Sequence, residues 1–294
     1  MEGAGVRLKR MFGNNEVPLL DPFLLLDNFG STNPADYVKG FPWHPHRGLE
    51  TVTYMLSGKT EHEDSLGNQG VIDSGDVQWM SAGSGIMHQE MPKRTEGLLS
   101  GFQLWVNLPH SLKMETPSYR GVGAADIPVV RGEDGRVVKV IAGSYDRVEG
   151  PVRHIPVDPL YLDVTLPPNT EFQHPVKKGY TVFAQAIDGA GCFDPMGAPA
   201  VGEEPKPLYS GSISPSNESV SRPGHTVLYG DGDTVRIHAQ DGGLRFILVS
   251  GKPLHEPVSW YGPIVMNTRE EILEAVTDLR KGTFIRSQKV INEA

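Results

Sequence analysis

Cysteine is nearly absent from this chain, since Cys192 is the only one among 294 residues. No disulfide can therefore form within one chain, and a metal site built from several thiolates is excluded. The sequence also lacks a run of eighteen apolar residues, and no apolar leader follows "MEGAGVRLKR". We therefore expect no membrane anchor and no export signal, and a cytoplasmic location.

A surplus of basic charge is missing as well. Lys and Arg number 27 against 36 Asp and Glu, so the formal net charge is −9. Proteins that bind nucleic acids through phosphates usually carry a basic face, and the nearest approach to one is the short run "VRLKR" at 6–10. Direct binding to nucleic acid is therefore not expected, whereas docking to another protein stays open.

What the chain has is glycine and proline between short apolar runs. With 34 Gly and 24 Pro, strand-like pieces such as "LETVTYMLS" (49–57) and "GFQLWVNLP" (101–109) recur every 8–15 residues, with turn signals between them. This pattern predicts an all-β protein, a sandwich or barrel of antiparallel strands.

One helix is expected, at residues 268–281 near the end of the chain. Thr268 can cap it and Glu271 occupies the reciprocal capping-box position. Lys281 followed by Gly282 is a typical C-terminal signal of a helix. The residues expected on its apolar face are Ile272, Leu273, Val276 and Leu279.

The sequence contains a weak internal repeat, here called the internal echo. "HPHRGLETV" (44–52) lies over "HPVKKGYTV" (174–182), and "GDVQWMSAGSGIMHQEM" (75–91) lies over "GDTVRIHAQDGGLRFIL" (232–248). The two offsets differ by 27 residues. A Pro/Gly/Ser-rich segment at 196–223, which reads as a surface insertion, accounts for this difference.

The echo predicts two related β units in tandem. We place the first domain at 1–125, a linker at 126–156, and the second domain with the terminal helix at 157–294.

The residues with the clearest chemical signal form two pairs. Residues i and i+2 of a strand point to the same face, so His44 and His46 project together, as do His88 and Glu90 in "MHQEM". Three imidazoles and one carboxylate suit a first-row transition metal and leave two positions open if coordination is octahedral. A lone histidine is more often solvated or hydrogen-bonded, but two such pairs favour a metal site.

Three further side chains could lie either near the metal site or away from it. Gln103 and Trp105 alternate on one strand, so both either face the metal or belong to the core. His62 lies in the charged run "EHED" (61–64), and we expect it in a solvated loop.

"HPHRGLETVTYMLSG" and "GDVQWMSAGSGIMHQEMP" resemble the first and second cupin motifs as they occur in the pirin family. The resemblance extends through "DPFLLLDNFG", "GFQLWVNLP" and "EPVSWYGPIVMNTREEI", and so spans nearly the whole chain. It implies a bicupin of two tandem jelly-roll-type β-barrels, with one metal, usually iron, in the first. The ligands it implies are His44, His46, His88 and Glu90.

The second copy departs from this ligand set. It keeps His174, but Val176 stands over His46, Arg245 over His88 and Ile247 over Glu90. The resemblance therefore implies a second barrel without metal, which serves a structural purpose.

Two functions follow from the resemblance. One is a dioxygenase of the quercetin 2,3-dioxygenase type, which uses Fe(2+) or another divalent transition metal, O2 and an aromatic substrate, with Glu90 as general base. The other is an iron-dependent redox-sensing regulator that binds a transcription factor or another protein partner, in the nucleus if the source is eukaryotic. The complete ligand set favours the enzyme.

Overall fold

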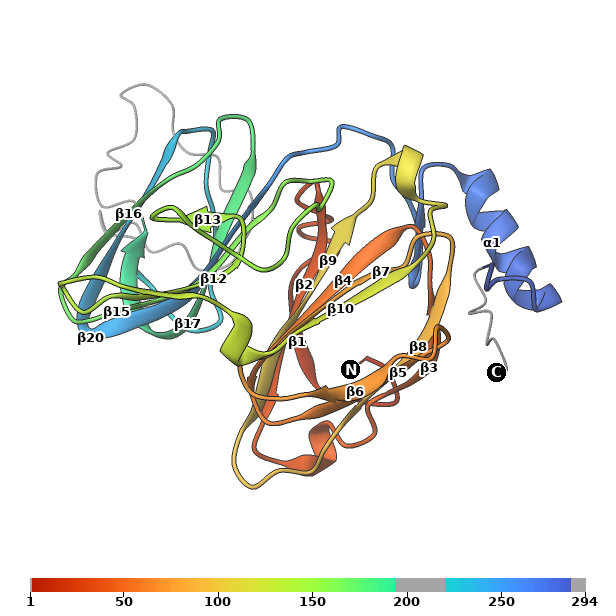
Figure 1. Cartoon of the computed structure of the whole chain (residues 1–294), viewed down its shortest axis with the longest axis horizontal. Coiled ribbons are helices and arrows are strands. Elements are labelled where there is room, and N and C mark those ends of the chain that lie inside the picture. The colour runs from red at the N-terminus through yellow and green to blue at the C-terminus, as the bar shows by residue number, and fades with distance from the viewer. Residues whose placement is uncertain (1, 194–219, 287–294) are drawn as a thin grey trace, which may run out of the picture. The chain divides into compact units, whose positions relative to one another are not determined.

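The computed structural model describes residues 2–193 and 220–286 (Figure 1). Contacts between Cα atoms divide the chain into two compact units. The first comprises Met1–Asp126 with Leu254–Ala294, and the second Ile127–Pro253. Most of the insertion expected at 196–223 falls outside the described residues.

The first unit contains two antiparallel sheets. The strands of the larger, in spatial order, are β1 (Leu8–Phe12), β2 (Phe23–Ser31), β9 (Leu99–Asn107), β4 (Leu49–Ser57), β7 (Val77–Ser81) and β10 (Ser118–Val122). The strands of the smaller are β3 (Phe41–His46), β8 (Ile86–Pro92), β5 (Thr60–Asp64) and β6 (Gln69–Ile72). The two sheets face each other: Thr53 of β4, in the larger sheet, donates a hydrogen bond of 3.0 Å to Glu90 of β8, in the smaller sheet.

The described part of this unit also contains a short hairpin and one helix. They are β21 (Ser259–Tyr261), β22 (Ile264–Met266) and α1 (Arg269–Lys281). The 3₁₀ turns are Pro34–Asp36, His110–Leu112 and Ala124–Asp126. Within residues 2–193 and 220–286, no helix has both the length and the apolar character needed to span a bilayer.

The second unit is built on one antiparallel sheet. Its path is β11 (Val129–Arg131), β12 (Val137–Ala142), β15 (Leu160–Leu166), β20 (Thr234–Gly251), β17 (Thr181–Phe193) and β18 (Val220–Ser221), with β16 (Glu171–Pro175) on β20 and β19 (Thr226–Leu228) on β17. A small hairpin consists of β13 (Ser144–Tyr145) and β14 (Val148–Glu149). An apolar cluster of β-branched, leucine and phenylalanine side chains fills its interior. The prediction of an all-β fold with a terminal helix is confirmed.

The helix α1 agrees with its sequence signals except at one residue. Thr268 and Glu271 form the capping box, and Gly282 ends the helix with φ of 70°. Ile272 packs into an apolar cluster, but Leu273, which we expected on the apolar face, is 57% exposed. The buried face is therefore narrower than the four apolar residues suggest.

The domain boundaries differ from the expected ones in two places. Residues 127–156, expected as a linker, carry β11 to β14 and belong to the second unit. The segment from residue 254 onward, expected in the second domain, groups with the first. The internal echo ends near residue 248 and so carried no information about where this segment packs.

Candidate metal centre

Neighbouring strands bring the two predicted residue pairs together. β3 and β8 are antiparallel partners, and their register places His44 directly opposite His88. His46 follows two residues later on the same face of β3, as Glu90 follows His88 on β8. The alternation seen in the sequence therefore aims all four side chains toward the space between the sheets.

Three of these side chains form a compact cluster. The rings of His44 and His88 have centroids 4.3 Å apart, and His46 lies 4.9 Å from each of them. One ligand atom from each residue can be chosen so that all three lie within 4.8 Å of one another. Nitrogens bound to one ion at about 2.1 Å lie roughly 3 to 4 Å apart, so small ring movements suffice to close the cluster on a cation.

Hydrogen bonds select which nitrogen of two rings faces the cluster. His44 Nδ1 lies 2.9 Å from the carbonyl oxygen of Pro42, and His46 Nδ1 lies 3.2 Å from that of Pro263. A carbonyl only accepts, so each Nδ1 carries the proton, which leaves Nε2 with a lone pair for a metal.

Burial keeps two imidazoles of the cluster, those of His46 and His88, in the neutral form. Burial holds the pKa of His46 well below its usual range, with a further contribution from His44. Burial likewise lowers the pKa of His88, and His46, His44 and His62 add to this shift. A metal ligand must be deprotonated at the donor nitrogen, so the site is ready to bind a cation at neutral pH.

His88 gives the clearest sign of what the site is built for. Its side chain is fully buried, yet neither ring nitrogen has a hydrogen-bond partner among the described residues. A buried polar atom without a partner costs about 1–3 kcal/mol. A cation bound at one of the two nitrogens would relieve this cost for that nitrogen, so the residues present fit a divalent transition metal.

Glu90 lies beside the cluster without being one of its members. Its carboxylate accepts hydrogen bonds from Thr53 Oγ1 at Oε1 and from Gln103 Nε2 at Oε2, both at 3.0 Å. In the described part of the chain, residues 2–193 and 220–286, the group of ligand atoms that lie within 4.8 Å of one another contains the three histidines and not Glu90. Its role as the fourth ligand therefore stays a prediction.

His62 corrects one expectation from the sequence. Instead of lying in a solvated loop, it is 2% exposed on β5, with its ring centroid 5.5 Å from that of His88. Gln78 contacts His62 Nδ1 at 2.7 Å, and Asp64 contacts Nε2 at 3.2 Å. The run "EHED" alternates buried His62 and Asp64 with exposed glutamates, and this period of two is the signal that identifies a strand.

The cluster opens onto a cavity of about 750 Å³. His44 and His46 line it, together with Gln103 and Trp105 of β9 and Trp260 of β21. The ring of Trp105 lies 5.1 Å from that of His46 and 6.1 Å from that of Trp260. Gln103 and Trp105 thus face the interior beside the site.

An ion pair forms another part of the cavity wall. Arg10 Nε and Nη2 each donate to a carboxylate oxygen of Asp27 at 2.8 Å. Both residues line the cavity. The sequence offered no hint of this pair, because β1 and β2 become neighbours only through the sheet.

The corresponding positions of the second unit are arranged differently. Arg245 donates to both oxygens of buried Asp163, at 3.0 and 2.7 Å. The ring of His174 packs beside those of Tyr145 and Phe172, 5.5 and 6.2 Å away. These contacts are those of a structural core.

We expect Arg245→Ala to destabilise the second unit without changing metal binding in the first. Removing the guanidinium takes away both hydrogen bonds from Arg245 to the buried carboxylate of Asp163, and Lys139 Nζ, 4.0 Å away, is too distant to replace them. The free energy of unfolding should fall by about 2 kcal/mol, the usual contribution of hydrogen bonds to a charged group. Nickel affinity, measured by calorimetry, should stay unchanged; weaker nickel binding would contradict a site confined to the first unit.

Comparisons with known proteins agree with these features. The family model described as Pirin matches residues 5–106, and the one described as Pirin C-terminal cupin domain matches 161–285. A pirin-like protein of Caulobacter vibrioides is 43% identical over 96% of this chain and 94% of its own.

Two solved structures are similar as well. A quercetin 2,3-dioxygenase from Acinetobacter baumannii has a TM-score of 0.81 and 32% identity, covering 97% of this chain and 93% of its own. A bacterial pirin from Escherichia coli in complex with nickel(II) shares the fold with a TM-score of 0.63, at 20% identity, over 86% of this chain and 94% of its own.

Proposed function

Since the chain belongs to the pirin family, we propose that it is a metal-dependent dioxygenase that opens the heterocycle of a flavonol or a similar aromatic enol. The observation that carries this proposal is the cluster of three imidazoles, two of which line a cavity with aromatic walls. The similar Acinetobacter quercetin 2,3-dioxygenase supports the choice of reaction. Fe(2+) is the proposed metal, held by His44, His46, His88 and Glu90.

The metal, when bound, acts as a Lewis acid that lowers the pKa of a substrate hydroxyl placed beside it. Glu90 accepts that proton on a carboxylate oxygen. Thr53 and Gln103 hold this carboxylate by one hydrogen bond at each oxygen, so it is oriented before the substrate arrives.

The cavity supplies the fit for a planar ring. Trp105 and Trp260 present apolar aromatic surface, which favours a flat aromatic substrate. Arg10 and Asp27 add hydrogen-bonding groups to another part of the cavity lining, for the polar substituents of such a molecule. In the overall reaction one O2 is incorporated, the heterocycle opens and carbon monoxide is released.

A direct assay tests the proposal. The purified chain is loaded anaerobically with Fe(2+), mixed with quercetin and O2, and followed by loss of quercetin absorbance, oxygen uptake and release of carbon monoxide. We expect all three signals in equal molar amounts, and their reduction by at least tenfold in Glu90→Gln, which keeps the shape but cannot serve as the base. Absence of turnover with iron, manganese, nickel, cobalt and copper would overturn the enzymatic function.

A further inference from the structure

Residues 254–286, here named the C-terminal strap, are tied to the first unit beside His46. Asp21 anchors the start of the strap, because its carboxylate accepts hydrogen bonds from the backbone N–H groups of Leu254 at 3.0 Å and His255 at 2.8 Å. It then forms the hairpin of β21 and β22, followed by α1.

The middle of the strap is bonded to the turn that follows the ligand strand β3. The N–H of Val265 donates to the carbonyl oxygen of Arg47 at 3.0 Å. Buried Lys113 donates to the carbonyls of Gly48 at 2.7 Å and Val265 at 3.0 Å, and so joins both segments. Gly48 has φ of 79°, and a Cβ there would lie 2.0 Å from the oxygen of Val265. The approach is therefore too close for any other residue.

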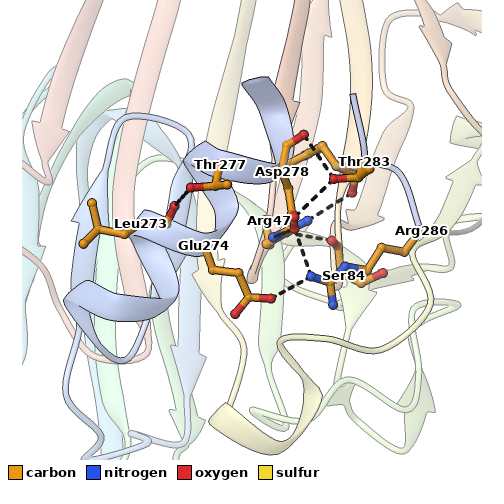
Figure 2. A network of polar contacts seen from close by, with 9 residues as sticks. Arg47, Ser84, Leu273, Glu274, Thr277, Asp278, Thr283 and Arg286 are labelled. Atoms are coloured by element: carbon orange, nitrogen blue, oxygen red, sulfur yellow. Dashed lines mark hydrogen bonds and ion pairs between the residues drawn. The ribbon is translucent and has the colours of Figure 1, made fainter. Parts of the chain in front are cut away.

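The end of the strap encloses the side chain of Arg47, the residue after His46 (Figure 2). Arg47 is 1% exposed. Its guanidinium donates to Asp278 of α1 at 2.9 Å and to the carbonyl oxygens of Phe284 at 3.0 Å and Ser84 at 2.7 Å. Asp278 is its only anionic hydrogen-bond partner among the described residues, so the charge of Arg47 stays buried only while α1 is docked.

The contact of the strap with the metal centre itself is the carbonyl of Pro263, which accepts the proton of His46 Nδ1 at 3.2 Å. The partner of the second ring nitrogen orients a ligand imidazole, and its loss typically weakens metal binding 10–100-fold. Because this partner is a backbone atom, its position depends on how the strap is docked.

We propose that the C-terminal strap is a positioning element for His46, so that docking of α1 and metal binding are coupled. Arg47, Asp278 and Pro263 are the positioning residues. Coupling between two events is reciprocal, so a bound metal also stabilises the docked strap. This inference rests on the metal centre of the proposed function but not on its oxygenase activity.

Substitutions on α1 test the first direction of the coupling. Asp278→Ala should weaken the affinity for Ni(2+), measured by calorimetry, about tenfold and change the visible absorption spectrum of bound Co(2+). Asp278→Asn should lose less, because the amide oxygen can still accept from Arg47. The control is Glu274→Ala, one turn earlier on α1, because the carboxylate of Glu274 accepts a hydrogen bond from Arg286, whereas that of Asp278 accepts the one from Arg47.

Amide hydrogen exchange of the unaltered full chain tests the reverse direction of the coupling. This experiment needs no variant, so it still tests the proposal if the variants do not fold. Ni(2+) should slow exchange of the Val265 amide and its neighbours in β22 at least tenfold. Unchanged exchange in this strand, or unchanged nickel affinity in folded Asp278→Ala, would overturn the coupling. A chain that binds no nickel at all would overturn the metal centre and the coupling together, whereas nickel binding without flavonol turnover would overturn the oxygenase alone.

Discussion

His88→Leu should weaken Ni(2+) binding by more than about 100-fold and yet leave the metal-free protein as stable as the original chain, or more stable. The loss of affinity follows because one of the three clustered imidazoles disappears. Stability should not suffer, because both ring nitrogens of His88 are buried without a hydrogen-bond partner among the described residues. Replacing such a group by an apolar side chain of similar size removes a cost of about 1–3 kcal/mol.

Two measurements check this result: calorimetric titration with Ni(2+), and urea unfolding of the metal-free protein. The matched control is His174→Leu, which removes another buried histidine, from β16 of the second unit. It should leave nickel affinity unchanged. A metal-free His88→Leu protein that unfolds several kcal/mol more easily would indicate that His88 is an ordinary core residue, and would remove the main argument for the metal centre.

Glu50→Gln should stabilise the protein at alkaline pH and have little effect at acidic pH. Burial raises the pKa of Glu50 to about 7, although hydrogen bonds from Trp79 and Ser81 and the charge of Arg120 lower it. In the unfolded chain this carboxyl titrates at its ordinary value near 4.5. As the pH rises from about 4.5 to above 7, the unfolded chain releases this proton more readily than the folded protein does. The free energy of unfolding therefore falls by about 3 kcal/mol in total.

Glutamine stays neutral throughout this range and keeps an oxygen to accept from Trp79 Nε1, which lies 3.1 Å from Glu50 Oε2. The difference in free energy of unfolding between variant and original chain should thus grow from near zero at pH 4.5 to about 3 kcal/mol at pH 8.5. Urea unfolding at several pH values measures it. Exposed Glu96→Gln is the control and should show no such growth. A difference independent of pH would contradict a raised pKa at Glu50.

The metal centre could be predicted from the sequence as far as its histidines because its signal is local. A period of two places His44 with His46 and His88 with Glu90, and strand pairing then needs only to make β3 and β8 neighbours. The prediction for His62 was wrong although its signal is equally local. The residues of "EHED" alternate between buried and exposed, but their charge suggested a solvated loop. Polarity alone was a poorer guide to burial than periodicity.

Other parts of the site could not be read from the sequence. The hydrogen bond between His46 and Pro263 joins residues 217 positions apart, and the ion pair of Arg47 and Asp278 spans 231. Neither carries a pattern in the residues around it. The pair of Arg10 and Asp27 likewise exists only because β1 and β2 lie side by side.

The sequence by itself determined that this protein is all-β with two related units and a capped terminal helix, and that three histidines share one interior, since propensity, alternation and capping act between near neighbours along the chain. Only the tertiary structure decided that the last described segment returns to the first unit and completes the surroundings of His46. The physical reason is that a buried guanidinium and a shielded carbonyl find their partners by packing, which depends on the whole fold and not on local spacing.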